Sequence, residues 1–148
     1  MSDSAPPNGA RPIDFGLLGP LLVVRDGRSL QLGGSRQRAV LALLLLQANR
    51  TVSLSHLIGG VWGDDAPPAA VQTAQTYVFH LRRELEPDRP PRSPSQLLST
   101  VGAGYVLSVD PRHTDVGRFH DAVEAARAAT TASWNLPTSV CLGSTDKT

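Results

Sequence analysis

Cysteine is scarce and long apolar runs are absent in this 148-residue sequence. The single cysteine, Cys141, cannot form an internal disulfide and supplies no cysteine cluster for zinc. The longest apolar run covers residues 39–46, which is far too short to cross a bilayer. Residues 1–7 have neither the basic start nor the apolar stretch of a signal peptide. We therefore expect a cytoplasmic protein that is neither secreted nor embedded in a membrane.

The side-chain combinations typical of enzymes and metal sites are also missing. No Gly-x-Ser-x-Gly turn places a nucleophilic serine, and no helix N-terminus follows the turn Gly102-Ala103-Gly104 to form a phosphate cradle. The histidines lack metal-ligand spacing and cysteine partners; they are His56, His80, His113 and His120. These absences predict a protein that is not an enzyme and that uses no metal, no cofactor and no small-molecule substrate.

The apolar content of the chain is sufficient for one small domain. Hydrophobic residues make up 41% of the sequence, and the formal net charge is only +1. Residues 1–12 are polar and proline-rich, which predicts a disordered arm, and residues 130–148 lack periodicity, which predicts a disordered tail. Residues 14–32 alternate short apolar runs with the turns Gly19-Pro20 and Asp26-Gly27, which indicates three antiparallel strands.

Two helices are predicted after this sheet. The first covers residues 36–48 behind a Ser35 cap. The second begins after a Ser53 cap and ends at Gly63, with apolar residues at helical spacing between them. A very short strand at Thr51-Val52 is compatible with the link between the two helices.

A third helix is predicted over residues 69–86, because Pro68 suits a first turn and Pro87 stops a helix. Its apolar stripe consists of Val71, Ala74, Val78, Leu81 and Leu85. The opposite side is mainly polar but includes one aromatic residue; its members are Gln72, Gln75, Thr76, Phe79 and Arg83. An aromatic side chain on a polar face is typical of a surface that binds a partner.

A second hairpin and a last helix complete the predicted elements. The hairpin pairs residues 97–100 with 105–109, and the last helix runs from Thr114 or Asp115 to about Ala128. Two helices, a longer helix and a hairpin follow one another in the order of a winged helix-turn-helix. In that fold the first two helices brace the third, whose polar face enters the major groove of DNA.

Five sequence blocks in register make a family resemblance specific. They are residues 15–21 (FGLLGPL), 32–39 (LGGSRQRA), 61–67 (VWGDDAP), 75–85 (QTYVFHLRREL) and 100–105 (TVGAGY). Over residues 14–109 the chain resembles the OmpR-type winged-helix DNA-binding domain, in the version carried by the Streptomyces antibiotic regulatory protein (SARP) family of transcription regulators.

The resemblance implies an α+β fold, a winged helix-turn-helix with an N-terminal antiparallel sheet, three helices and a C-terminal β-hairpin wing. It implies an OmpR-type DNA-binding domain at residues 13–110. Residues 111–129 are similar to a linker and the first helix of the family's bacterial transcriptional activation domain. Most of that activation domain is expected to be absent.

The resemblance also implies which residues contact partners. The expected recognition-helix contacts are Gln72, Thr73, Thr76, Phe79, His80 and Arg83. The expected phosphate contacts are Arg36, Arg38 and Arg82, and the expected wing residues are Thr100, Gly102, Gly104 and Tyr105. The expected RNA polymerase contacts are two acidic residues in the loop before the third helix, Asp64 and Asp65.

These features predict a sequence-specific regulator that binds double-stranded promoter DNA at direct repeats. It would contact RNA polymerase and activate a biosynthetic gene cluster. Two alternatives stay open at this point: a DNA-binding competitor or repressor without activation function, and an inert remnant that needs a partner protein. Many OmpR-type proteins have an arginine where Phe79 or His80 stands here, and the wing position that is often arginine is Val101.

Overall fold

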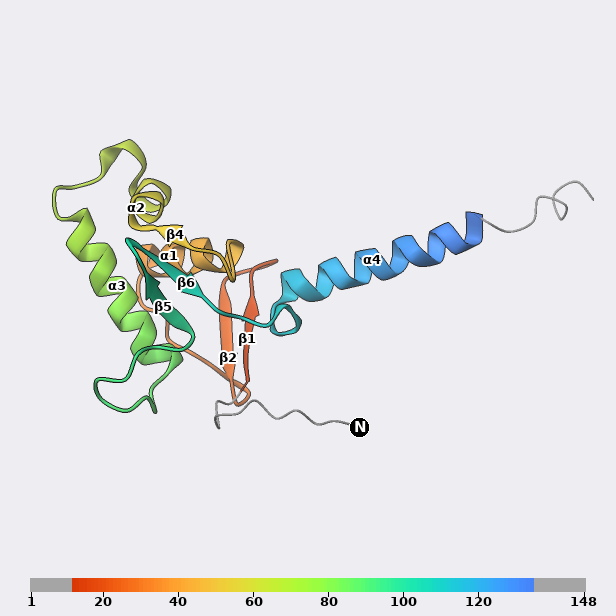
Figure 1. Ribbon diagram of the computed structural model, residues 1–148, viewed down its shortest axis with the longest axis horizontal. Coiled ribbons are helices and arrows are strands. Elements are labelled where there is room, and N and C mark those ends of the chain that lie inside the picture. Colours follow the sequence, from red (N-terminus) through yellow and green to blue (C-terminus); the bar gives the residue numbers. More distant parts are fainter. Residues whose placement is uncertain (1–11, 135–148) are drawn as a thin grey trace, which may run out of the picture.

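The computed structural model describes the backbone of residues 12–134 and the side chains of residues 12–130. The predicted arm at residues 1–12 lies outside this range except for Pro12, and so does the predicted tail beyond Trp134. Two small three-stranded sheets and three helices form the body, from which a fourth helix projects (Figure 1).

The first sheet contains β1 (Ile13–Gly16), β2 (Leu22–Arg25) and β3 (Arg28–Ser29), which are antiparallel and lie in that order. The β2–β3 turn is Asp26-Gly27, whose φ angles are 54° and 75°. Both values lie in the left-handed region that a tight two-residue hairpin requires. The three-stranded sheet predicted from the sequence is therefore confirmed.

The first helix, α1 (Ser35–Leu46), differs from its prediction at both ends. Its N-cap is Gly34, which offers no side-chain hydrogen bond, so the predicted Ser35 cap is wrong and Ser35 is the first helical residue. The reason is the preceding Gly33, which takes a φ of 79° and turns the chain one residue earlier. The helix ends at Leu46 rather than near Ala48.

The next helix, α2 (Leu54–Trp62), is capped as predicted. The Ser53 Oγ accepts a hydrogen bond from the His56 backbone N–H at 3.1 Å, and Gly63 ends the helix with a φ of 64°. Both ends of α2 are therefore set by residues that the sequence identifies.

A short 3-10 turn, η1 (Gly63–Asp65), separates α2 from α3 (Ala70–Leu85). α3 is one residue shorter at each end than the predicted range of 69–86. Pro68 therefore precedes α3 instead of lying in its first turn, and the residue at the N-cap is Ala69.

The second sheet contains β4 (Val52–Ser53), β5 (Leu98–Val101) and β6 (Gly104–Leu107), in the order β4-β6-β5. The β5–β6 hairpin is the predicted wing. A Cβ atom on Gly104 would lie 2.5 Å from the Val52 carbonyl oxygen, so β4 can approach β6 only because this residue is glycine. Since α2 follows β4 directly, this pairing ties the wing to the start of α2.

One hydrophobic core joins both sheets and the three helices of the body. Its largest fully buried side chains come from β2, α1, α2, α3, β5 and β6; they are Val23, Val40, Leu41, Leu44, Leu57, Val78, Leu81, Leu85, Leu98 and Leu107. Close packing in a shared core fixes the relative positions of the elements that contribute to it. The position of the wing relative to α3 is set in this way.

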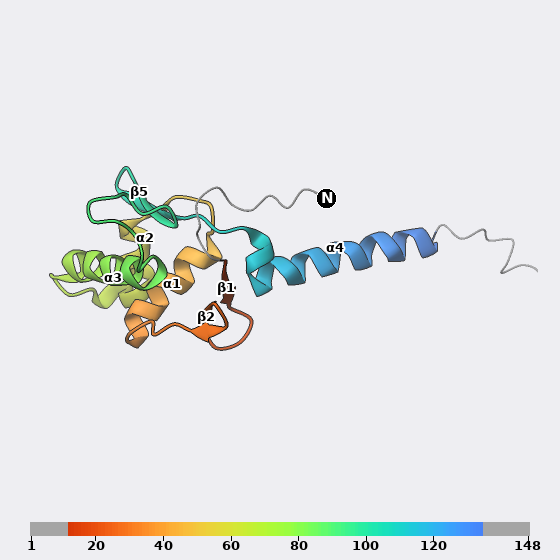
Figure 2. The same ribbon diagram turned by 90° about the horizontal axis from the view of Figure 1, so that it is seen from below.

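The last helix is α4 (Asp115–Trp134), which follows the 3-10 turn η2 (Pro111–His113) and projects away from the body in both views (Figures 1 and 2). It continues beyond the predicted end near Ala128, so residues 130–134, expected in the tail, are helical. The predicted order, in which the last helix follows the second hairpin, is confirmed.

The base of α4 is attached to the first sheet by its own N-terminal residues. The Asp115 carboxylate accepts hydrogen bonds from the backbone N–H groups of Leu17 and Leu18, at 2.8 and 2.9 Å. Thr114 is buried, forms a bridge to Phe15, and accepts a hydrogen bond from the Gly117 N–H through its Oγ1. The start of α4 is therefore part of the packed body.

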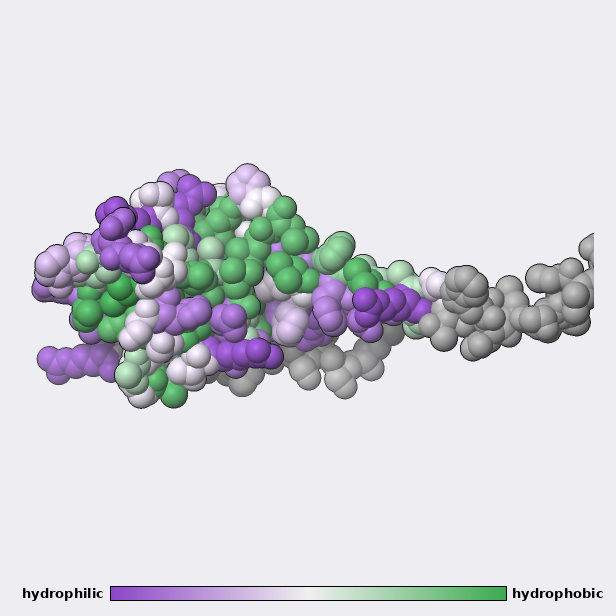
Figure 3. Space-filling view, turned by 90° about the horizontal axis from the view of Figure 1, so that it is seen from above, coloured by the Kyte–Doolittle hydropathy of each residue, from purple (hydrophilic) through white to green (hydrophobic). Residues whose placement is uncertain are grey.

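Hydrophobic side chains also reach the surface. Seen from above, they gather over the middle of the body, and a few more lie on the first part of α4 (Figure 3). On α4 the exposed ones include Val116 at 37% and Phe119 at 59% of their full accessible area. Between residues 12 and 134, no helix combines the length and the apolar character that a membrane crossing would need.

Candidate nucleic-acid interface

α3 has one buried side and one exposed side. The buried residues are Ala70, Ala74, Val78, Leu81 and Leu85, four of which belong to the predicted stripe. The fifth residue of the predicted stripe, Val71, was predicted to be buried but is 47% exposed. Ala70 takes the inward position in the first turn, and one further residue rotates Val71 away from the core.

Four side chains form a row on the side of α3 opposite the buried residues. They are Gln72, Thr76, Phe79 and Arg83, and we call this row the outer ridge. Spacings of four, three and four residues place them nearly above one another along the helix. All four are exposed, so the outer ridge faces away from the body along almost the whole helix.

The outer ridge combines hydrogen-bonding and apolar groups. Gln72 and Arg83 lie at its two ends, and Phe79, between them, is 53% exposed. The Thr76 Oγ1 donates a hydrogen bond to the Gln72 backbone carbonyl at 2.9 Å, so the hydroxyl is engaged within the helix. The middle of the ridge is therefore more apolar than its ends.

Three other residues flank the outer ridge. Gln75 and His80 are exposed on its two sides, and the His80 ring lies 5.9 Å from the Phe79 ring, measured between centroids. Thr73 is only half-buried and lies further round the helix. Five of the six predicted recognition residues thus lie on the fully exposed part of α3.

Arg82 is directed toward the wing. Its Nε donates to the Leu98 carbonyl oxygen at 2.8 Å, and one terminal nitrogen donates to the Thr100 Oγ1 at 2.7 Å. The guanidinium carbon lies 5.7 Å from the centre of the Tyr105 ring. Burial lowers the pKa of Arg82 from its ordinary value. These contacts join α3 to both strands of the wing.

The four predicted wing residues have different environments. Thr100 and Gly102 are exposed, and Gly102 lies in the turn at the tip. Gly104 is buried against β4, and Tyr105 is only 8% exposed beneath Arg82. The outer surface that the wing offers therefore comes from its tip and not from Tyr105.

The two arginines at the start of α1 lie apart. Arg36 is exposed, and its guanidinium carbon is 5.9 Å from the centre of the Trp62 ring. Trp62 at the end of α2 stacks on Tyr77 of α3, with 6.2 Å between ring centres and 6° between ring planes. Arg36 is therefore next to the junction of α2 and α3.

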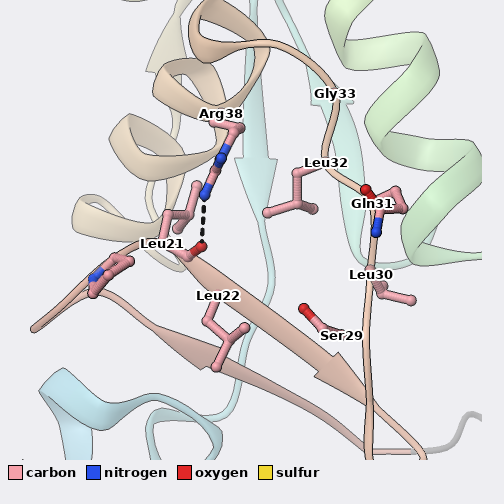
Figure 4. Close-up of a pocket in the computed structure, with 9 residues that line it drawn as sticks. Leu21, Leu22, Ser29, Leu30, Gln31, Leu32, Gly33 and Arg38 are labelled. Carbon is pink, nitrogen blue, oxygen red and sulfur yellow. Dashed lines mark hydrogen bonds between the residues drawn. The ribbon is translucent and has the colours of Figure 1, made fainter.

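Arg38 points toward the first sheet. One of its terminal nitrogens donates to the Leu21 carbonyl oxygen at 3.2 Å (Figure 4). Arg38 and Leu21 border an open hollow of about 440 Å³, which is also lined by Leu22, Leu30 and other residues of the segment before α1. Two positions along a helix correspond to a rotation of about 200°, which explains why Arg36 and Arg38 lie on different sides of α1.

The two acidic residues expected to face RNA polymerase lie in η1. Asp64 and Asp65 are both exposed, and they stand between the end of α2 and the start of α3. The loop that carries them is separate from the outer ridge of α3 in the sequence and lies at the N-terminal end of that helix.

Comparison with known proteins identifies the same type of domain. Residues 27–107 match the family model described as "Transcriptional regulatory protein, C terminal". The regulatory protein AfsR of Streptomyces coelicolor is 36% identical over 118 residues, which cover 80% of this chain and 11% of AfsR. The transcriptional regulatory protein EmbR of Mycobacterium tuberculosis is 38% identical over 107 residues, which cover 72% of this chain and 27% of EmbR.

Solved structures agree with the sequence matches. The structure of Mycobacterium tuberculosis EmbR in complex with a low-affinity phosphopeptide matches with a TM-score of 0.68 at 38% identity, over 74% of this chain and 28% of that chain. The DNA-binding domain of the response regulator AdeR, solved in complex with an intercistronic region, has a TM-score of 0.51. Its 21% identity, over 68% of this chain and 97% of that one, supports the fold alone.

The chain thus spans only a fraction of the relatives that it matches, about a tenth of AfsR and a quarter of EmbR. The matched part contains the three helices, the second sheet and the wing. The resemblance to SARP regulators inferred from the sequence is confirmed by these relatives. The chain belongs to the transcriptional regulatory protein C-terminal family, and its folded body is an OmpR/PhoB-type winged-helix DNA-binding domain of the kind found in SARP regulators.

Proposed function

We propose that this chain binds double-stranded promoter DNA in a sequence-specific way and regulates transcription in the cytoplasm. The observation that carries the proposal is the outer ridge of α3, an exposed row of side chains held by a helix whose other side is fully packed. A major groove is wide enough to admit one such helix. In this proposal residues 13–110 form the DNA-binding domain, and residues 111–129 form a linker and the opening helix of an activation domain.

The chemistry of the outer ridge supports readout of base edges. The Gln72 amide can form two hydrogen bonds with adenine, and the Arg83 guanidinium can do the same with guanine. His80 is placed to add a contact from one flank, and Thr73 has less exposed surface to offer. Arg36 beside the α2–α3 junction and the wing tip at Gly102 are suited to the DNA backbone on either side of α3.

We further propose that the chain activates a biosynthetic gene cluster, as the SARP resemblance implies. Asp64 and Asp65 in η1 would then contact RNA polymerase, since carboxylates close to DNA favour a basic protein partner over phosphate. Binding at direct repeats is expected, because a head-to-tail arrangement needs no two-fold interface.

Selection from a pool of random DNA duplexes tests the first part of this proposal. The parent chain should enrich a defined sequence, and the triple variant Gln72→Ala/Thr76→Ala/His80→Ala should bind that sequence no better than an unrelated duplex. The three side chains are exposed, so the circular dichroism spectrum and melting temperature should stay those of the parent. Unchanged specific affinity in a gel shift of the folded triple variant would contradict the proposal.

Footprinting and run-off transcription test the second part. If the chain activates, its footprint should consist of direct repeats next to the −35 element, and transcription should rise when it is added to purified RNA polymerase. If the footprint overlaps the polymerase site and transcription falls, the chain is a DNA-binding competitor without activation function. A single inverted repeat bound by a stable solution dimer would contradict the head-to-tail arrangement.

A further inference from the structure

We infer that Phe79, together with the methyl group of Thr76, contacts the C5 methyl group of a thymine in the DNA site and so determines part of its sequence. The inference rests on the proposed function, because it assigns a base contact to the same helix. It adds a preference that is made by apolar contact, in addition to the hydrogen bonds of Gln72 and Arg83.

Phe79 is exposed because the core has no place for it. Five other residues of α3 already fill its buried side, so the core makes no use of the Phe79 ring. The ring is 53% exposed in the middle of the outer ridge, where His80 is its aromatic neighbour at 5.9 Å. Leaving so much apolar surface in water is unfavourable, and covering it in a complex would return that free energy.

Thr76 precedes Phe79 by about one helical turn. Its hydroxyl donates to the Gln72 carbonyl at 2.9 Å, so the one donor proton of the side chain is already used and the methyl is its exposed apolar group. Three residues along a helix correspond to about 4.5 Å, which brings this methyl close to the Phe79 ring. The two groups form a small apolar area in the ridge, bounded by Gln72 and Arg83.

The group that best fits this apolar area is the thymine methyl. Base edges in the major groove present hydrogen-bond donors and acceptors and only one apolar group, the C5 methyl of thymine. The apolar area consists of one ring and one methyl between polar residues, which is too small for a protein interface but large enough to cover such a methyl. Gln72 and Arg83 lie about 6 Å from it along the helix on either side, within reach of neighbouring base pairs.

The experiment removes the methyl group from the DNA and leaves every hydrogen bond in place. The duplex that the parent chain enriches from the random pool is synthesised with deoxyuridine at one thymidine position at a time. Affinities for each duplex are measured by gel shift with the parent, Phe79→Ala, Thr76→Ser and Val71→Ala. Val71→Ala is the matched control, because Val71 is an exposed apolar residue of the same helix that lies off the outer ridge.

The parent should lose about fourfold in affinity at one or two thymine positions, the loss expected when one methyl group is no longer covered. Phe79→Ala should bind more weakly than the parent but should show almost no further loss at those positions. Thr76→Ser, which keeps the hydroxyl, should show a reduced loss, and Val71→Ala should show the full one. Melting temperatures like the parent's check that all variants are folded.

Two results would overturn the inference and leave the proposed function standing. One is an enriched duplex at which no deoxyuridine substitution weakens the parent. The other is a loss in Phe79→Ala equal to that of the parent. If no sequence is enriched at all, the proposed function fails and the inference fails with it, so the two failures are distinguishable.

Discussion

Arg82 and Arg83 are adjacent in the sequence but contact different surfaces. One residue of α3 corresponds to a rotation of about 100°, so Arg83 lies on the outer ridge while Arg82 reaches the wing strands. The charge pattern of the sequence predicts both as basic residues near DNA. The family resemblance assigns Arg83 to the recognition surface and Arg82 to phosphate, but the sequence could not predict that Arg82 bonds to Leu98 and Thr100, because these contacts depend on how a hairpin sixteen to eighteen residues away packs on the helix.

Arg82→Ala should lower the stability of the domain as well as DNA affinity. It removes two hydrogen bonds and leaves the Leu98 carbonyl, a partly buried group, without this donor, so the free energy of unfolding should fall by about 1–3 kcal/mol. Arg83→Ala removes the same charge from an exposed position and should leave the melting temperature unchanged while weakening DNA binding. Thermal unfolding and gel shifts of both variants check this, and equal melting temperatures for both would contradict it.

Arg36 and Arg38 form a second matched pair of arginines. Arg36→Ala should weaken binding to all sequences alike and reduce the slope of log K against log salt by about one unit, the effect of one lost phosphate contact. Arg38→Ala should change the slope less, because Arg38 bonds to Leu21, just before β2, and does not lie at the α2–α3 junction. A salt titration of both variants on one duplex measures the difference. Equal slopes for parent and Arg36→Ala would exclude the phosphate contact.

The sequence predicted those ends and turns of helices and strands that depend on residues within the same segment. The Asp26-Gly27 turn, the Ser53 cap and the end of α2 at Gly63 follow from residues within each segment. The prediction of a Ser35 cap was wrong because the backbone at Gly33 shifts the start of α1. The prediction that Val71 is buried was wrong because Ala70 is the residue that contacts the core. Neither outcome is visible in periodicity alone.

The charge of Asp115 helps to attach α4 to the first sheet. Burial raises the pKa of Asp115, but hydrogen bonds from the N–H groups of Leu17, Leu18 and Val116 outweigh it and hold that pKa below its ordinary value. A carboxyl whose pKa is lower in the folded than in the unfolded chain stabilises the fold above its unfolded pKa, which is about 3.9, and loses this effect as the pH falls.

Asp115→Asn should therefore melt at a lower temperature than the parent near neutral pH, and the gap should narrow as the pH falls below about 4. Asp121→Asn is the control, because Asp121 is an exposed residue of the same helix. Thermal unfolding followed by circular dichroism across this pH range makes the measurement. A gap that is independent of pH would show that the Asp115 charge is not what anchors the helix.

At the scale of the whole molecule, the proposed polymerase contact and the proposed DNA contact lie on different loops and helices. Asp64 and Asp65 stand in η1, before the first turn of α3, where they would repel nearby phosphates. Asp64→Asn/Asp65→Asn should leave DNA affinity unchanged or slightly higher and should lower run-off transcription from a bound promoter. Activation equal to that of the parent would make this loop a structural turn only.

The attachment of α4 has a geometric consequence for any group at its far end. A helix of 20 residues is about 30 Å long, and its base is held by Thr114 and Asp115 against the first sheet. The helix is therefore anchored to the DNA-binding domain at its N-terminal end only, and a tilt of about ten degrees there displaces the far end by about 5 Å. One residue inserted in mid-helix would rotate the far half about the helix axis by about 100° and move it outward by about 1.5 Å. If the outer ridge binds in a groove as proposed, the contacts at Thr114 and Asp115 set the direction in which α4 leaves the DNA-bound domain.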